Sequence, residues 1–155
     1  MPQRHPLDLA RGHSVCSPAA LPRPGANDTD PPMITATRIH LTIAMLMGLA
    51  GVTLLAAGTH AGGSDNVQIA GQMLLFHAPA VIAACTARRA ELLADWPARL
   101  AISLMILGVA LFSADLAMRG FHGERLFLGA APAGGFMMLG GWLGLVIAAL
   151  FAKRA

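Results

Sequence analysis

Five polar side chains lie inside or beside the long apolar runs of this sequence, and their types could do chemistry: Gln72, His77, Asp115, Arg119 and Arg125. A histidine or a carboxylate held in apolar surroundings can move a proton or bind an ion. Asp115 and Arg119 are four residues apart, which places both on one helix face and permits an ion pair. These residues therefore predict either a functional polar site or a set of structural contacts.

His77 stands in the apolar stretch MLLFHAPAVIAA, and its role has two interpretations. One is a functional ionisable group within a membrane. The other is a neutral imidazole that donates to a backbone carbonyl or a hydroxyl of a neighbouring helix. Pro79 favours the structural role, because proline has no N–H for the carbonyl of Leu75. We expect a neutral His77 that faces the helix bundle and bonds to protein.

The helical rise sets the depths of the other polar groups. Gln72 and Asp115 are predicted at similar depth, whereas His77 lies about 7 Å deeper than Asp115, so a relay between those two would need a water. We expect Asp115 to pair with Arg119 or Arg125 and to hold the following turn against the third helix.

The composition predicts helices that cross a membrane. Hydrophobic residues make up 55% of the chain, charged residues only 12%, and the mean hydropathy is +0.61. Uncharged runs of 26, 22 and 27 residues follow Arg38, Asp65 and Arg125, and a fourth run of 15 residues follows Arg99 and reaches 19 if Asp115 is included. A membrane-spanning helix needs about 20 residues. We predict an all-α polytopic membrane protein, a bundle of four transmembrane helices at about 39–57, 69–87, 100–118 and 132–151.

Small residues and prolines in these spans are assigned to helix packing. Gly140 and Gly144 form a G-x-x-x-G pair, which often marks a close helix contact, either within the bundle or between two copies. The complete set assigned to packing is Pro79, Pro132, Gly134, Gly135, Gly140 and Gly144.

Basic residues predict the orientation of the bundle. Nine of the eleven lie in the N-terminal tail, between the second and third spans, or at the C-terminus, against Arg119 and Arg125 on the other side. Basic flanks stay in the cytoplasm, so both termini are predicted inside. The basic residues do not cluster on one folded face, which argues against nucleic-acid binding.

Residues 1–32 differ from the rest of the chain. They hold seven of the ten prolines and no apolar run long enough for a core or a secretory signal, so we expect a disordered tail. The alternative is that translation starts at Met33. Residues 34–155 then form one transmembrane domain.

Four sequence blocks carry a family resemblance: GTHAGGSDNVQIAGQMLLFHAPAV from Gly58, LFSADLAMRG from Leu111, RLFLGAAPAGG from Arg125 and GGWLGLVIAAL from Gly140. With them, residues 38–152 resemble the YgdD-like family of small bacterial membrane proteins (domain of unknown function 423), most closely the branch with Asp and Arg in the third helix. The resemblance implies four spans and an inner-membrane location. It implies no catalytic role.

The sequence favours a non-enzymatic protein. We find no nucleotide-binding, hydrolase or metal-ligand spacing, and we expect neither a cofactor nor a metal. The expected surroundings are the lipid bilayer, and the expected partners are a second copy or another membrane protein; passage of a small solute or a proton is a further role of this kind. The alternative is an intramembrane enzyme that uses His77, or an outer-face cluster of His60, Asp115, Arg119 and Arg125.

Overall fold

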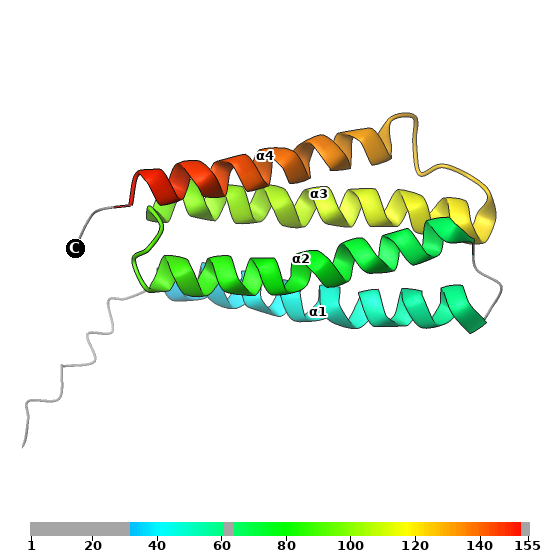
Figure 1. The fold of residues 1–155 in the computed structure, drawn as a ribbon, viewed down its shortest axis with the longest axis horizontal. Coiled ribbons are helices and arrows are strands. Elements are labelled where there is room, and N and C mark those ends of the chain that lie inside the picture. Colours follow the sequence, from blue (N-terminus) through cyan, green and yellow to red (C-terminus); the bar gives the residue numbers. More distant parts are fainter. Residues whose placement is uncertain (1–31, 61–63, 153–155) are drawn as a thin grey trace, which may run out of the picture. The chain divides into compact units, whose positions relative to one another are not determined.

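A computed structural model describes residues 32–60 and 64–152. This part of the chain consists of four helices, α1 (Pro32–His60), α2 (Asp65–Arg89), α3 (Asp95–His122) and α4 (Ala130–Leu150), and contains no strand (Figure 1). All four are long and apolar enough to cross a membrane. The predicted all-α fold with four spans is confirmed. The tail predicted to be disordered, residues 1–32, lies outside the described residues except for Pro32, the first residue of α1. The alternative start of translation at Met33 stays a prediction.

The first three helices are longer than the predicted spans. Helix α1 has 29 residues and α3 has 28, which correspond to about 42–44 Å at 1.5 Å per residue, against a hydrocarbon layer of about 30 Å. Their ends therefore project into the polar zone. Asp95 and Pro97 lie in the first turn of α3, where proline removes no helical hydrogen bond. Helix α4 starts two residues before Pro132 and ends one residue before Phe151.

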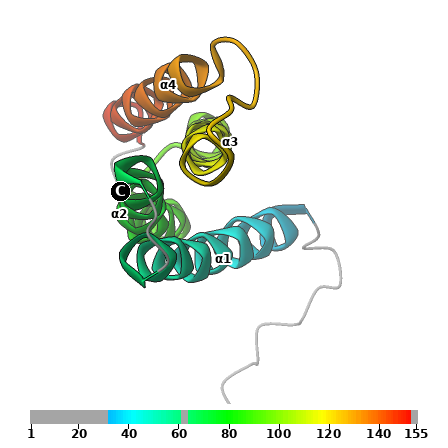
Figure 2. The ribbon, with the colours of Figure 1, turned by 90° about the vertical axis from the view of Figure 1, so that its right-hand side faces the viewer.

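Each helix packs mainly on its neighbours in sequence. Helix α1 lies against α2, α2 against α3, and α3 against α4, and the end-on view shows this order as an open row (Figure 2). Half of the apolar window of α3 is buried, but only 22% of that of α1 or α4. The middle helices therefore hold the arrangement together, while α1 and α4 present broad apolar faces.

Pairs of glycines allow two of these helix contacts. A Cβ atom on Gly71 of α2 would lie 2.9 Å from the carbonyl oxygen of Gly51 in α1. Likewise, a Cβ atom on Gly134 of α4 would lie 2.7 Å from the carbonyl oxygen of Gly108 in α3. Backbones thus touch at both contacts, as small residues permit in membrane helix pairs.

The bundle has two ends, which we name by their chain segments. The terminal end carries Pro32, the α2–α3 loop (residues 90–94) and the end of α4; the rim end carries the end of α1, the start of α2 and the α3–α4 loop (residues 123–129) (Figure 1). At the terminal end, the N–H of Ala94 donates to the carbonyl of Ala148 at 2.9 Å. At the rim end, Gly123 and Gly129 adopt positive φ angles of 75° and 90°, which suit glycine. These bends return the chain into the bundle.

Candidate functional site

Asp115 is a fully buried acid of α3 near the rim end. One carboxylate oxygen accepts the backbone N–H of Leu126 at 2.8 Å. The other pairs with the guanidinium of Arg119, one turn further along the helix. The carboxylate therefore fixes the α3–α4 loop to α3 and is neutralised by its own helix. Of the two arginines expected to pair with Asp115, the structure places Arg119 there.

Arg125 has a different position. Its side chain is exposed, and within the described part of the chain it forms no ion pair. Arg125 and Arg119 line one depression of about 650 Å³ at the rim end, together with Gly129 at the start of α4. The Nε of Arg119 is buried and has no hydrogen-bond partner among the described residues.

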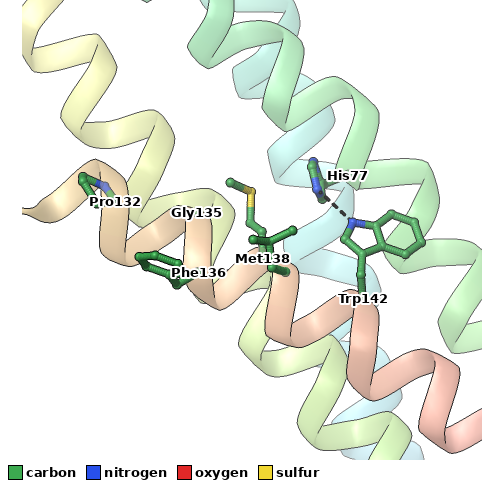
Figure 3. Close-up of a pocket in the computed structure, with 7 residues that line it drawn as sticks. His77, Pro132, Gly135, Phe136, Met138 and Trp142 are labelled. Atoms are coloured by element: carbon green, nitrogen blue, oxygen red, sulfur yellow. Dashed lines mark hydrogen bonds between the residues drawn. The ribbon is translucent and has the colours of Figure 1, made fainter.

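His77 lies in the middle of α2 and is partly buried. Its Nδ1 is 2.8 Å from the carbonyl oxygen of Met73, one turn back on the same helix. Its Nε2 is 3.4 Å from the indole Nε1 of Trp142 in α4, a long hydrogen bond (Figure 3). An indole N–H can only donate, so Nε2 accepts and the proton of the neutral ring sits on Nδ1.

The acceptor of His77 differs from the one that Pro79 frees. Helical side chains fold back over the preceding turn, so the imidazole reaches the carbonyl of Met73 in its own helix. Pro79 is exposed, and its assignment to helix packing stays a prediction. The contact to a second helix is made instead by Trp142 of α4.

Gln72, His77 and Asp115 do not meet. The side chain of Gln72 is exposed, whereas Asp115 is buried with Leu126 and Arg119 as partners. His60, the fourth member of the predicted outer-face cluster, is exposed at the end of α1. A similar depth in the membrane does not bring Gln72 and Asp115 together. Gln72 lies on an exposed face of α2, whereas Asp115 lies on a buried face of α3.

The glycines of α4 divide into a packed and an open group. A Cβ atom on Gly144 would lie 2.8 Å from Cβ of Ala101 in α3, and one on Gly140 would meet the side chain of Leu104 at 3.1 Å. Gly134 faces α3, but a Cβ atom on Gly135 would have nothing within 4 Å. One residue turns a helix by about 100°, which carries Gly135 off the packed face. Gly135 thus has open space beside it within the bundle and Pro132 is exposed, and their assignment to helix packing stays a prediction.

Gly135 and Pro132 line a depression of about 490 Å³ between α2 and α4. His77 borders it from α2, and Phe136, Leu139 and Trp142 border it from α4 (Figure 3). The lining is apolar except for the imidazole and the indole N–H. Pro132 and Gly135 also line the depression that holds Arg119 and Arg125, so the two depressions adjoin at these residues of α4. We call the two adjoining depressions together the α4 groove.

A second polar group, at the terminal end, was missed as a site. Arg88 is only 5% exposed, donates to the hydroxyl of Thr37 in α1, and lies 3.6 Å from the carboxylate of Asp95 in α3. The buried His40 of α1 lies 3.0 Å from the hydroxyl of Ser103 in α3. The spacing of these residues along α1 and α2 is the sequence feature that could have identified the group. Buried positions recur three or four residues apart in two series: 81, 84, 85 and 88 in α2, and 37, 40, 44 and 47 in α1.

Within residues 32–60 and 64–152, no group of three or more His, Cys, Asp or Glu side chains could hold a metal ion. Comparison with curated proteins and with solved structures found no match. One family model matches residues 54–135, from the second half of α1 to the first turns of α4. This segment contains His77, Asp115, Arg119 and Arg125, and it covers more than half of the 155 residues. The chain belongs to the family described as protein of unknown function DUF423.

Proposed function

We propose that this protein is a non-enzymatic, multi-pass protein of the bacterial inner membrane that acts through contacts of its helices with other membrane components. The observation that carries the proposal is the use of the polar side chains within the four helices. Several of them join one segment of the chain to another.

These polar contacts join α1 to α2 and α3, α2 to α3 and α4, and α3 to the α3–α4 loop. Arg88 and Thr37 join α2 to α1, and Ser113 of α3 donates to the carbonyl of Ala70 in α2 at 3.2 Å. Polar side chains in a membrane commonly act in this way, as hydrogen bonds between helices. Contacts of this kind among the described residues include Arg88 with Thr37 and Asp95, His40 with Ser103, Ser113 with Ala70, Asp115 with Leu126, and His77 with Trp142.

The same contacts argue against an enzyme or a proton relay. Both ring nitrogens of His77 and both carboxylate oxygens of Asp115 are engaged by protein groups. A general base must have an atom within reach of the proton that it removes. His77 and Asp115 are thus both engaged by protein groups, and the broad apolar faces of α1 and α4 remain for contacts in the bilayer.

Proton passage is the closest competing role, and it can be measured directly. The full-length chain is placed in liposomes that contain a pH-sensitive dye, and a pH gradient is imposed. We expect the gradient to decay as in protein-free liposomes. A faster decay that is lost in His77→Leu or Asp115→Asn, with both variants folded, contradicts the proposed function.

The proposed orientation places both termini in the cytoplasm, because nine of eleven basic residues lie on the side of the termini and the α2–α3 loop. Reporter fusions at residues 64 and 122 are expected to lie outside, and a fusion at residue 93 is expected to lie inside. An outside signal at residue 93 contradicts both the orientation and the four crossings in the membrane.

A further inference from the structure

The lining of the α4 groove changes from charged to apolar along its length. At the rim end it is lined by Arg119, Arg125 and the Gly129 turn, and from there it continues past Pro132 and Gly135. Toward the middle of the bundle it becomes apolar and ends against the contact between His77 and Trp142. An occupant that fits both parts must be charged at one end and hydrocarbon at the other.

The charged part of the groove has the chemistry of a phosphate site. Of the described residues that line it, none is acidic. Guanidinium groups bind phosphate with two parallel hydrogen bonds, and the amino end of α4 adds partial positive charge. Asp115 neutralises Arg119 in part, whereas Arg125 is exposed and has no ion-pair partner among the described residues.

The depth of the two parts matches a lipid of one leaflet. Trp142 is 12 residues beyond Ala130, the first residue of α4, which places it about 18 Å along the helix from its amino end, roughly the depth at which the acyl chains of one leaflet end. Arg119 and Arg125 lie near that amino end, where headgroups are found.

The absence of a side chain at Gly135 keeps the two parts connected. A Cβ atom there would meet nothing within 4 Å, so the space beside this residue is open. It lies between the arginines and the apolar part, because Gly135 lines both. A large side chain at this position would divide the groove without touching the packed face of α4.

We propose that the α4 groove holds one anionic phospholipid, with its phosphate at Arg119 and Arg125 and an acyl chain running past Gly135 to the His77–Trp142 contact. The proposal rests on the membrane placement of the proposed function and names one component that the helices contact. An anionic headgroup is favoured over a zwitterionic one because two guanidinium groups line the site without an acid.

Quenching of tryptophan fluorescence by brominated acyl chains reports the occupant. The chain has two tryptophans, and Trp96→Phe leaves Trp142, which borders the groove, as the sole reporter. The full-length Trp96→Phe protein is placed in phosphatidylcholine vesicles that contain a small, varied fraction of lipid brominated near the chain end. Brominated phosphatidylglycerol and brominated phosphatidylcholine are compared at equal fractions. We expect phosphatidylglycerol to quench Trp142 at the lower fraction.

Two variants test the two ends of the site. Arg125→Gln is expected to reduce the preference for phosphatidylglycerol about fivefold, the equivalent of about 1 kcal/mol for one arginine near a lipid surface. Arg89→Gln removes the same charge from an exposed position at the terminal end and is expected to leave the preference unchanged. Gly135→Leu is expected to abolish it, and Ala50→Leu, on the exposed face of α1, is the control for added bulk.

The outcomes separate this proposal from the proposed function. Equal quenching by the two lipids, or equal effects of Arg125→Gln and Arg89→Gln, overturns the anionic lipid site and leaves the membrane placement intact. Quenching that falls as the protein-to-lipid ratio rises shows that a second copy fills the groove, which also overturns the site. If neither lipid quenches Trp142, the residue is not in the bilayer and the proposed function itself fails.

Discussion

The backbone amide of Leu126 donates to the buried carboxylate of Asp115 at 2.8 Å, and this contact fixes the α3–α4 loop to α3. The loop then enters α4 through the positive-φ turn at Gly129. A single carboxylate, paired with Arg119, thus ties the loop that leads into α4 to α3.

Asp115→Asn keeps an oxygen for the amide of Leu126 but removes the charge that pairs with Arg119. We expect a loss of about 1–3 kcal/mol in the free energy of unfolding, because Arg119 then lacks its partner. Reversible unfolding in mixed detergent, followed by circular dichroism, measures this change.

A double-mutant comparison identifies the partner. The effects of Asp115→Asn and Arg119→Gln are expected to be non-additive by about 0.5 kcal/mol or more, whereas Asp115→Asn and Arg125→Gln are expected to add. Additivity in both combinations would show that Asp115 has no energetic coupling to either arginine.

His77→Leu is expected to lower the thermal stability in detergent, because it removes a contact between α2 and α4. Trp142→Phe removes the indole N–H and retains an aromatic ring. The two changes are expected to be coupled by about 0.6 kcal/mol, the average for hydrogen bonds between membrane helices. Trp96→Phe is the control, since Trp96 is 71% exposed, and its effect is expected to add to that of His77→Leu. A stable His77→Leu variant that lost a binding or transport activity would contradict the structural role.

Gly134 and Gly135 form a matched pair on α4. Gly134→Ala is expected to destabilise the protein, because its Cβ atom would lie 2.7 Å from the carbonyl oxygen of Gly108. Gly135→Ala is expected to be neutral or to stabilise by up to about 1 kcal/mol, since alanine is the better helix former and the space is open. Thermal unfolding of the two variants in one detergent distinguishes them, and equal effects would contradict the packed face assigned to α4.

Arg88 and Arg89 provide a second matched pair, because each loses one charge at the same end of the bundle. Arg88→Gln is expected to cost about 1–3 kcal/mol, since the buried guanidinium bonds Thr37 and faces Asp95. Arg89 is exposed, and Arg89→Gln is expected to change stability by less than about 0.5 kcal/mol. Reversible unfolding in mixed detergent, as for Asp115→Asn, measures the free energy of unfolding of both variants. A larger loss for Arg89→Gln than for Arg88→Gln would contradict the buried position of Arg88.

The number and kind of helices could be predicted because each uncharged run is long enough to span a bilayer and a lipid solvent permits few other backbone structures. The ends could not, because the helices continue into polar sequence. Asp95 and Pro97 illustrate this: both were predicted to precede the third helix, and both lie in its first turn.

The site was predictable only where spacing along one helix was enough. The pairing of Asp115 with Arg119 follows from their separation by four residues. The contact of His77 with Trp142 depends on how far α2 and α4 are rotated toward each other, which no spacing within one helix specifies. For the same reason, Arg88 and Arg89 look alike as charges, although only Arg88 follows the buried stripe of α2.

The row-like order of the helices has a consequence for synthesis. Because α2 packs on α1, α3 on α2, and α4 on α3, each helix that leaves the ribosome finds its packing surface already in place. Most helix contacts join neighbours in sequence, so the entropy lost in closing long loops is small and assembly can proceed in the order of translation. Helix α4 completes the wall of the α4 groove, so the groove exists only after α4 has packed on α3.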